Sequence, residues 1–385
     1  MAIRYLTAGE SHGPQLTAIL EGCPSGVPLS AVDIDRDLAR RQLGYGRGGR
    51  MQIEQDRVSI VGGVRYGKTT GAPVALTIVN RDAAAWGDTL SPEEEAQRAE
   101  PVRIPRPGHA DLGGALLYGH TDLRDVIERA SARETAARVA CGAVARRLLE
   151  ELGCHVVSHV IGLGDVRAAS PSASLKAFAR VDENPVRCLD AEAARRMQAA
   201  IDRAAEQGDT LGGVFEVVAF GVPSGLGSYV QADRRLGARL AAAVMSIPAI
   251  KGVELGGGFA LTELPGSRVH DQITWRPGGG YGRVSNRAGG VEGGMSTGEP
   301  VVVRAAMKPI ATLRSPLGSV DMGTHEVVLS RFERSDVCAV PAAAVVGEAA
   351  VALVLADAVV ERFGDACLAD VLAAVRLFGE RIRKA

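Results

Sequence analysis

The chain has 385 residues, of which 46% are hydrophobic, so it can bury a large core. Its 44 basic residues nearly balance 45 acidic ones, and the net charge of −1 argues against a general nucleic-acid binder. The sequence begins without a signal-peptide apolar segment and has no uninterrupted apolar run of about 18–20 residues, so we expect a cytoplasmic protein without membrane contact. Six scattered cysteines lack CxxC spacing and are expected to be reduced thiols.

The first ninety residues predict short strands joined by glycine-rich turns, at 3–7, 14–21, 57–64 and 73–80. One helix interrupts them, with Ser30 as its N-cap, a body from Asp33 to Gln42 and Gly44 as its stop. Further strands are predicted at 155–163, 212–222, 251–255, 258–264, 268–275 and 301–306. Further helices are predicted at 125–152, 190–207, 231–246, 341–363 and 368–382. Strand clusters grouped around helices predict an α+β fold, and no linker divides the chain, so residues 1–385 are expected to form one domain.

Two histidines lie in turns where glycine or proline fixes the backbone. His12 belongs to Gly-Glu-Ser-His-Gly (9–13), and His109 to Arg-Pro-Gly-His-Ala-Asp (106–111). An imidazole titrates near neutral pH, with an ordinary pKa of about 6.5, and therefore suits proton transfer. The alternative is that each histidine only hydrogen-bonds its turn. The other histidines have no comparable setting and are interpreted as structural, and no ligand spacing predicts a metal site.

Arginine supplies most of the positive charge, because lysine occurs at only five positions. Arg41, Arg47 and Arg50 lie in a glycine-rich segment, and planar guanidinium groups bind phosphate in a bidentate manner. Arg133 lies on the apolar face of the predicted 125–152 helix. A buried guanidinium needs an anionic partner, so Arg133 is expected to meet either an internal carboxylate or a ligand phosphate.

Three C-terminal features are less specific. Arg334 and Asp336 fall on one side of an extended segment, a pattern that a surface ion pair also produces. The glycine-rich stretch 286–298 indicates close backbone approach to a ligand, a flavin ring or another strand. Lys308 follows the predicted strand at 301–306 and begins the segment Lys-Pro-Ile-Ala-Thr.

Taken in order, a series of segments spanning essentially the whole chain resembles the chorismate synthase family. They are GESHGPQLTAILEGCPSG (9–26), RRQLGYGRGGRM (40–51), RPGHADLGG (106–114), RASARETAARVACGA (129–143), GVPSGLGSYVQADRRL (221–236), IKGVELGGGF (250–259), SNRAGGVEGGMSTGEPVVVRAAMKPIATL (285–313) and RSDVCAVPAAAVV (334–346).

The resemblance implies a carbon–oxygen lyase of the shikimate pathway that converts 5-enolpyruvylshikimate 3-phosphate to chorismate and phosphate. The reaction is an anti 1,4-elimination that requires reduced FMN (FMNH2) although it is redox-neutral. The family's fold is a single-domain β-α-β sandwich, with antiparallel sheets flanking central helices, in homotetramers. NADPH is expected only as a possible flavin reductant. The absence of a reductase-like segment favours a separate flavin reductase over self-reduction.

The resemblance also implies roles for residues at matching positions. His12 resembles the acid that protonates the departing phosphate, His109 the residue that manages flavin protonation, and Asp336 the residue that helps remove the ring hydrogen. Substrate-binding positions correspond to Ser11, Arg41, Arg47, Arg50, Arg106, Arg133 and Arg334. Flavin-binding positions correspond to Arg129, Ala130, Ser131, Pro248, Ala249, Gly293, Lys308, Pro309, Ile310, Ala311, Thr312 and Arg334.

Three positions depart from the common family pattern: Ala130 replaces serine, Pro248 replaces asparagine, and Val337 replaces proline. Only backbone contacts are therefore expected at 130 and 248. Two other functions remain open from the residues alone. An NADPH-dependent flavin reductase would use the arginines for NADPH but lacks a dinucleotide fingerprint. An RNA-binding module could use Gly46–Arg50 but lacks repeated RGG motifs and an aromatic platform.

Overall fold

The computed structural model describes residues 3–48, 55–93, 99–169, 174–333 and 335–384. The described chain mixes helices with several antiparallel sheets, which confirms the predicted α+β class. All six cysteines are free thiols, and five of them are buried.

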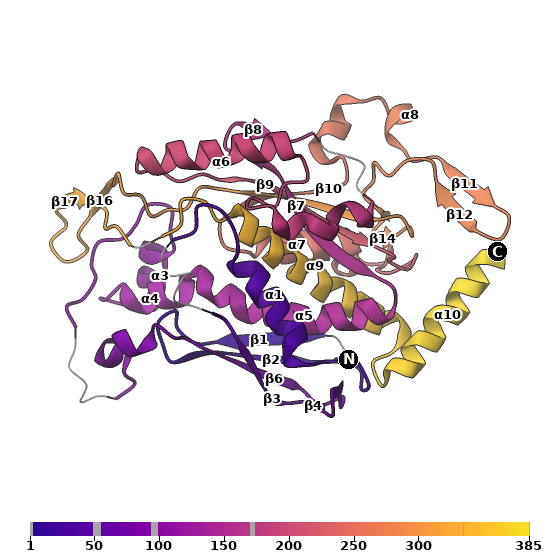
Figure 1. Cartoon of the computed structure of the whole chain (residues 1–385), viewed down its shortest axis with the longest axis horizontal. Helices are drawn as coiled ribbons and strands as arrows, with labels where there is room; N and C mark the ends of the chain where they lie inside the picture. The colour runs from indigo at the N-terminus through magenta and orange to yellow at the C-terminus, as the bar shows by residue number, and fades with distance from the viewer. Residues whose placement is uncertain (1–2, 49–54, 94–98, 170–173, 334, 385) are drawn as a thin grey trace.

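A four-stranded antiparallel sheet forms the lower layer in Figure 1. Its order is β1 (Arg4–Ala8), β2 (Gln15–Glu21), β6 (Val74–Val79) and β3 (Val58–Gly62). Apolar residues alternate along these strands, so Leu16, Ala18 and Leu20 of β2 all point into the core. A two-stranded ribbon, β4 (Val64–Arg65) and β5 (Lys68–Thr69), extends its end.

A five-stranded antiparallel sheet forms the upper layer. Its order is β10 (Ile250–Leu255), β15 (Val301–Met307), β9 (Gly213–Phe220), β7 (His155–Leu163) and β8 (Val166–Arg167). Two helices pack near this sheet, α6 (Ala191–Glu206) and α7 (Leu236–Met245).

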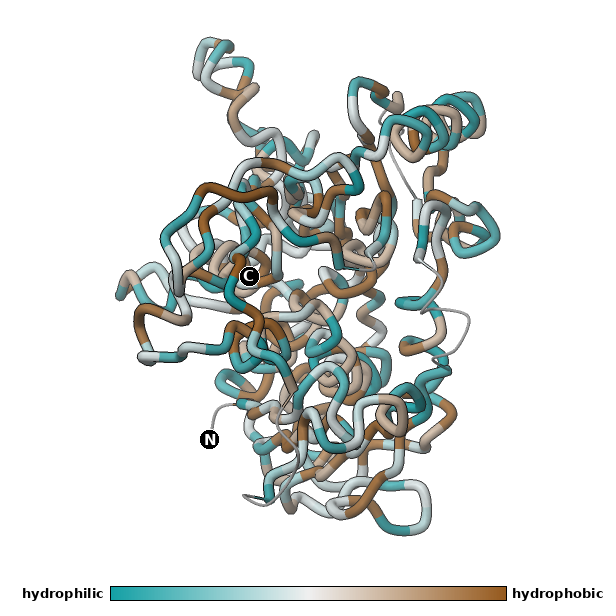
Figure 2. Tube along the Cα trace, turned by 90° about the vertical axis from the view of Figure 1, so that its left-hand side faces the viewer, coloured by the Kyte–Doolittle hydropathy of each residue, from teal (hydrophilic) through white to brown (hydrophobic). Residues whose placement is uncertain are grey.

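Three helices lie between the sheets: α1 (Ala31–Gln42), α5 (Thr135–Glu151) and α9 (Val340–Phe363). Helix α5 contacts β2, β6 and β7, while α9 contacts β7 and β9. Helices α5 and α9 approach closely at Gly142, where an added Cβ would lie 2.3 Å from Ala349 Cβ. The buried apolar residues of these helices and of both sheets form one large core cluster, whereas along the trace hydrophobic residues alternate with hydrophilic ones (Figure 2). Helix α9 is long and apolar enough to span a membrane, but 83% of its apolar window is buried in this core.

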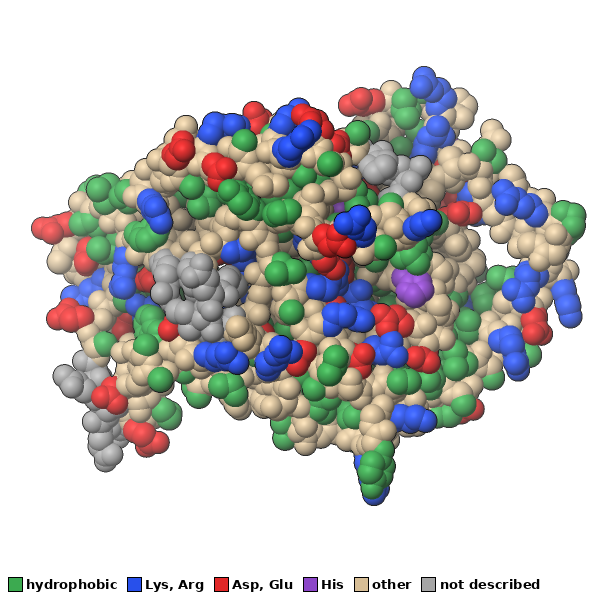
Figure 3. Space-filling view, viewed as in Figure 1, with side chains coloured by type: hydrophobic (Ala, Val, Ile, Leu, Met, Phe, Trp, Pro, Cys, Tyr) green, Lys and Arg blue, Asp and Glu red, His purple; other side chains and the backbone are tan. Residues whose placement is uncertain are grey.

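A buried ion network ties these helices together around Glu348 of α9. Arg40 of α1 donates to both carboxylate oxygens, at 2.8 and 2.9 Å. Arg146 of α5 donates at 2.5 Å, Arg187 at 3.0 Å and the hydroxyl of Ser158 at 2.6 Å. Charged side chains also meet on the surface: Figure 3 shows basic side chains next to acidic ones in the region of α1 and α5.

Peripheral elements project from both ends (Figure 1). At one end lie α10 (Leu368–Lys384) and the hairpin β11 (Ile273–Arg276)–β12 (Gly280–Arg283). At the other lie α3 (Asp111–Tyr118), α4 (Arg124–Ala130) and the hairpin β16 (Gly318–Val320)–β17 (Val327–Leu329). The described residues also form α8 (Gly266–Val269), the ribbon β13 (Val291–Glu292)–β14 (Met295–Ser296) and several short 3-10 helices.

Several predicted elements are confirmed. Helix α1 begins after Ser30, whose side chain forms a capping box with Asp33. Asp190 caps α6 by accepting from the backbone N–H groups of Glu192 and Ala193. The predicted helix at 341–363 corresponds to α9 and that at 368–382 to α10.

Four predicted elements are wrong in part or in whole. The 125–152 helix is divided at Ser131, whose backbone is extended (ψ 142°) and whose side chain caps a short 3-10 turn before α5. The 231–246 helix begins only at Leu236, after a 3-10 turn. The strand at 258–264 is a 3-10 helix, because the left-handed backbones of Gly256 (φ 57°) and Gly258 (φ 52°) end the preceding strand. Of the strand at 268–275, only the part from Ile273 is extended.

Candidate active site

His12 lies in the turn between β1 and β2, and one carboxylate holds it there. Gly9 (φ 106°) makes this turn possible, because an added Cβ would lie 2.4 Å from the carbonyl oxygen of Gln15. His12 Nδ1 lies 2.9 and 3.0 Å from the two carboxylate oxygens of Glu128 in α4. The His12 backbone N–H also donates to Glu128 Oε2 (2.8 Å), and its ring stacks on Trp86 with centroids 4.0 Å apart.

The 129–131 segment lies against the same turn. Ser131 Oγ donates to Ser11 Oγ (3.0 Å), which brings together a predicted flavin position and a predicted substrate position. Arg129 donates to the carbonyl oxygen of Thr7 (3.0 Å), so its side chain follows the end of β1. Ala130 ends α4 between them and offers only backbone polar groups.

His109 lies in the loop that leads into α3, beside a buried carboxylate. Its Nδ1 is 2.5 Å from Asp111 Oδ1, and Arg106 donates to Asp111 through Nε (2.8 Å) and Nη2 (3.0 Å). Arg106 Nη1 also donates to Thr312 Oγ1 (3.2 Å). Burial raises the pKa of Asp111, but the hydrogen bonds from His109 and Arg106 outweigh it and hold that pKa well below its usual range.

The two histidine segments are neighbours. Helix α3 packs on α4, and Leu123 N–H donates to the carbonyl oxygen of Val102 (2.8 Å). Val102, Ala115, Leu123 and Ile127 form a small buried cluster between the segments. Figure 1 shows α3 and α4 close together at one end of the molecule.

Arg133 and Arg41 share the buried carboxylate of Asp56. Arg133 donates to Asp56 Oδ1 (2.5 Å) and to Asn80 Oδ1 (2.9 Å), so it does have an internal carboxylate partner. Arg41 Nη1 is 3.6 Å from Asp56 Oδ2, and Arg41 Nε donates to Thr135 Oγ1 (2.9 Å). Burial lowers the pKa of Arg41 to about 10, although Asp56 opposes this, and the charge of Arg133 acts in the same direction as burial. Among the residues that the structure describes, Asp56 thus lies between two buried guanidinium groups.

Arg47 and Asp336 meet across a long sequence separation. Arg47 Nη1 donates to Asp336 Oδ2 (2.6 Å), and the Gly48 backbone N–H donates to Oδ1 (2.6 Å). An added Cβ on Gly48 would lie 3.0 Å from the carbonyl oxygen of Ser335, so a larger residue here would push the neighbouring backbone by a few tenths of an ångström. Two other predicted substrate residues, Arg50 and Arg334, lie outside the described residues.

Most of the remaining predicted flavin positions gather beside the His109 loop. Lys308 N–H donates to the carbonyl oxygen of Ala249 (2.9 Å), whose left-handed backbone (φ 68°) turns the chain after Pro248. A Cβ added to Gly108 would lie 3.7 Å from Lys308 Nζ and 3.8 Å from Ala311 Cβ. Together with the Arg106–Thr312 contact, these distances place the 308–312 segment, which includes Pro309 and Ile310, beside that loop.

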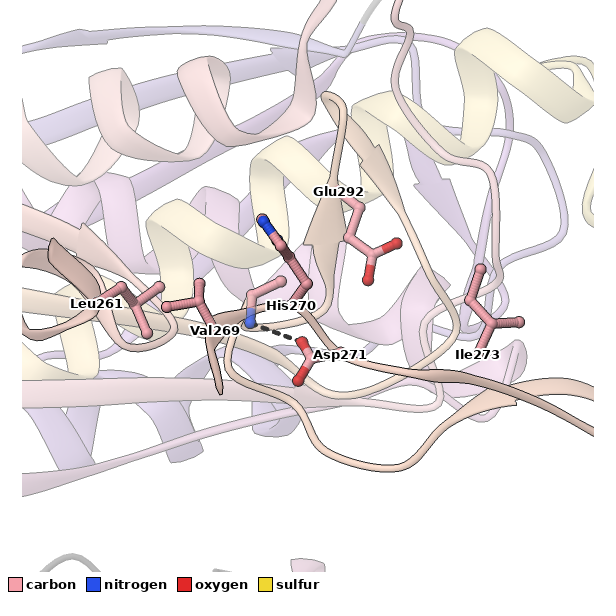
Figure 4. A pocket seen from close by; sticks show the side chains of 7 residues that line it. Leu261, Val269, His270, Asp271, Ile273 and Glu292 are labelled. Atoms are coloured by element: carbon pink, nitrogen blue, oxygen red, sulfur yellow. Dashed lines mark hydrogen bonds between the residues drawn. The ribbon is translucent and has the colours of Figure 1, made fainter. Parts of the chain in front are cut away.

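Gly293 is not brought into this group. The adjacent Gly294 accepts from the N–H of Leu236 at the start of α7, whereas Ala249 follows the other end of that helix. Ten helical residues separate the two ends by about 15 Å. A hollow of about 420 Å³ lies near Gly293, lined by Leu261, Val269, His270, Asp271, Ile273, Ala288 and Glu292 (Figure 4). Asp271 accepts from the backbone N–H of Ala288 there, and Glu292 pairs with Arg283, so both acids stabilise local structure.

Sequence reasoning missed the groups that hold the predicted residues. Asp111 could have been found, because it follows His109 by two positions in the same motif. Glu128 contacts His12 from 116 positions away, and Asp56 contacts Arg133 from 77 positions away, so no local pattern predicted them. Trp86 and Asn80 likewise become visible only through the fold.

Two histidines held by carboxylates, with buried arginines nearby, are typical of an enzyme active site. The family model described as chorismate synthase matches residues 3–360. Chorismate synthase of Geobacillus thermodenitrificans is 58% identical over 94% of this chain and 95% of the relative, and that of Moorella thermoacetica is 59% identical over 94% of each. A chorismate synthase crystal structure superposes with a TM-score of 0.81 at 41% identity, covering 100% of this chain and 99% of that one. The chain belongs to the chorismate synthase family.

Proposed function

We propose that this chain catalyses the last step of the shikimate pathway, the elimination of phosphate from 5-enolpyruvylshikimate 3-phosphate to give chorismate. The observation that carries the proposal is the position of Ser11 and His12 in one turn, joined through Ser131 to the segment that bears Arg133. Family membership supports the same reaction. The family's activity does not favour the alternative, an NADPH-dependent flavin reductase.

The substrate is proposed to bind beside Arg41 and Arg133. In the described part of the chain these two buried arginines share Asp56, and guanidinium groups suit an anionic ligand group. Donors fixed before the substrate arrives stabilise the charge that develops as the C–O bond breaks. His12 would donate a proton to the departing phosphate, with Ser11 as a further hydrogen-bond partner. Arg47, Arg50, Arg106 and Arg334 are proposed to make the remaining contacts with the substrate.

Asp336 is proposed to assist removal of the ring hydrogen. Both of its carboxylate oxygens accept hydrogen bonds here, from Arg47 and from Gly48. Each oxygen keeps a second lone pair, which could accept the proton while these hydrogen bonds hold the carboxylate in place. His109, whose Nδ1 faces Asp111, is proposed to hold or release a proton next to the flavin.

The family requires reduced flavin, and the residues around Lys308 fit reduced FMN. Burial lowers the pKa of Lys308, and in the part of the chain that the structure describes its ammonium group faces the carbonyl oxygen of Pro309 (3.5 Å) and pairs with no carboxylate. A half-buried cation without a carboxylate suits the anionic part of a flavin nucleotide. Reduced FMN would supply electron density as the C–O bond breaks and regain it when the ring hydrogen leaves. The residues assigned to hold it are Arg129, Ala130, Ser131, Pro248, Ala249, Lys308, Pro309, Ile310, Ala311, Thr312 and Arg334.

We also propose that the enzyme is a homotetramer, and the position of Gly293 supports assembly of more than one copy. In its own chain Gly293 lies next to the start of α7, whereas Ala249 follows the other end of this helix, about 15 Å further along its axis, so a flavin contact from Gly293 would come from a second copy. Its turn is open, since nothing lies within 4 Å of an added Cβ. We further propose that residues 1–385 form one domain with the family's β-α-β sandwich, and that the protein works in the cytoplasm, with NADPH serving a separate flavin reductase.

An anaerobic phosphate-release assay tests the function. The purified chain is mixed with 5-enolpyruvylshikimate 3-phosphate and photoreduced FMN, and we expect phosphate and chorismate in equal amounts. Oxidised FMN is the control and should give no product. Absence of phosphate with reduced FMN would refute the proposal. In a parallel assay, oxidation of NADPH by the chain with FMN alone would support the reductase alternative instead.

A further inference from the structure

One carboxylate, Glu128, makes three contacts with His12. Both of its oxygens lie within 3.0 Å of Nδ1, and Oε2 also accepts the His12 backbone N–H (2.8 Å). The carbonyl oxygen of Glu128 accepts the Ser11 N–H (3.1 Å). The side chain is almost fully buried, with 1% exposure. A buried charge is costly unless it is paired, and His12 is its nearest partner.

The other charged groups around Glu128 do not replace His12 as its main partner. Arg124, one turn earlier in α4, is farther from the carboxylate, at 3.4 Å, and also faces Glu333 at 3.8 Å. Burial raises the pKa of Glu128, but its hydrogen bonds and charge interaction with His12 outweigh this, and the net effect is a lowered pKa. Glu128 is therefore ionised at neutral pH. An ionised carboxylate only accepts hydrogen bonds, so His12 Nδ1 must carry the hydrogen.

We propose that Glu128 is a positioning residue that fixes a proton on His12 Nδ1, so that Nε2 is the atom that delivers a proton to the departing phosphate. Trp86 restricts the same ring by stacking on one face at an interplanar angle of 24°. The delivery step rests on the proposed function, whereas the location of the proton on Nδ1 does not.

The first test measures where the proton lies, without any turnover. Protein labelled with ¹⁵N-histidine is studied by solid-state NMR in alkaline buffer, and the His12 signals are assigned by their loss in His12→Asn. We expect the wild-type ring to be protonated on Nδ1. In Glu128→Gln this preference should be lost, because the glutamine amide can donate to Nδ1. An unchanged tautomer in Glu128→Gln would overturn the proposal.

The second test separates positioning from folding. Glu128→Gln should lower kcat on the order of 10²–10⁴-fold, as expected for a disabled acid, while KM changes by less than about threefold. Glu128→Asp keeps the charge and should recover both the tautomer and part of kcat. The matched control is Glu134→Gln, which removes a buried carboxylate that pairs with Arg138, and it should leave kcat unchanged.

The outcomes distinguish the two proposals. A kcat of Glu128→Gln within threefold of wild type would refute the positioning role. Should Glu128→Gln fail to fold, Glu128→Asp decides, and a ring no longer protonated on Nδ1 in that variant would count against the inference. If the wild-type chain released no phosphate, the proposed function would fall, but the NMR measurement would still report on Glu128.

Discussion

The buried network at Glu348 gives a quantitative prediction for Glu348→Gln. Glutamine keeps the size and hydrogen-bonding shape but removes the charge that compensates Arg40, Arg146 and Arg187. Breaking a buried ion pair by removing one partner costs about 3–5 kcal/mol. An unfolding entropy of about 2.1 cal/mol/K per residue over 385 residues gives about 0.8 kcal/mol/K, so Tm should fall by about 4–6 °C.

Differential scanning calorimetry measures this change, with Glu192→Gln as the matched control. Glu192 pairs with Arg195 on the surface, where both side chains are more than half exposed, 65% and 76%. Such pairs contribute about 0–1 kcal/mol, so Tm should move by about 1 °C or less. Equal shifts in the two variants would refute the assigned role of burial.

The same network predicts a dependence on pH. Burial raises the pKa of Glu348, but the three arginines outweigh it and hold that pKa well below the ordinary value of 4.5. Its folded-state pKa is thus lower than its unfolded pKa, and the stabilisation is present above about pH 4.5 and is lost as the pH falls further. The Tm difference between wild type and Glu348→Gln should therefore narrow from pH 5 toward pH 3. If the Tm difference between wild type and Glu348→Gln stayed constant from pH 5 to pH 3, the predicted direction of the pH dependence would be wrong.

Three more predictions concern the site. Gly48→Ala should raise KM for the substrate with little change in Tm, since its Cβ would press on Ser335 and disturb the contact with Asp336; unchanged kinetics would contradict this. Asp111→Asn should lower kcat by about 10²–10⁴-fold by releasing His109. It should also lower Tm more at pH 7 than at pH 3, because the stabilisation from the depressed pKa of Asp111 is complete above the unfolded pKa of 3.8 and is lost gradually as the pH falls below it. Lys308→Met should weaken binding of reduced FMN by about 10–100-fold in anaerobic titration, the loss expected for a hydrogen bond to a charged group; equal affinity would remove Lys308 from the flavin site.

The long elements could be predicted from sequence because their patterns repeat over several turns. Helix α9 is apolar along almost its whole length, and Ser30 marks the start of α1 by a local capping pattern. The break at Ser131 could not be predicted, because its neighbours on both sides favour helix and the break depends on contacts with Ser11. Similarly, apolar residues at 259–261 imitate a strand, but left-handed glycines direct the chain into a 3-10 helix.

For the site, the sequence identified residues whose side-chain chemistry and local motif point to function. Their hydrogen-bond and ion-pair partners became known only from the fold. His12 and His109 stood out by their turns and by the family resemblance. Whether Arg133 meets a carboxylate or a ligand was open until the fold brought Asp56 to 2.5 Å. Such pairings depend on sheet register and helix packing over dozens of residues, which no local pattern encodes.

The place of α9 in the chain has a consequence for synthesis on the ribosome. This helix could pass as a membrane span, yet every helix and strand it packs against, including α1, α5, α7, β7 and β9, precedes it in the sequence, except α10. The surfaces that bury it have therefore left the ribosome before α9 emerges, and it can dock on them as it appears. Glu348 and its arginines also give the arriving helix a fixed register. Chains that end before residue 340 would present the empty groove of this helix to the cell's quality-control machinery.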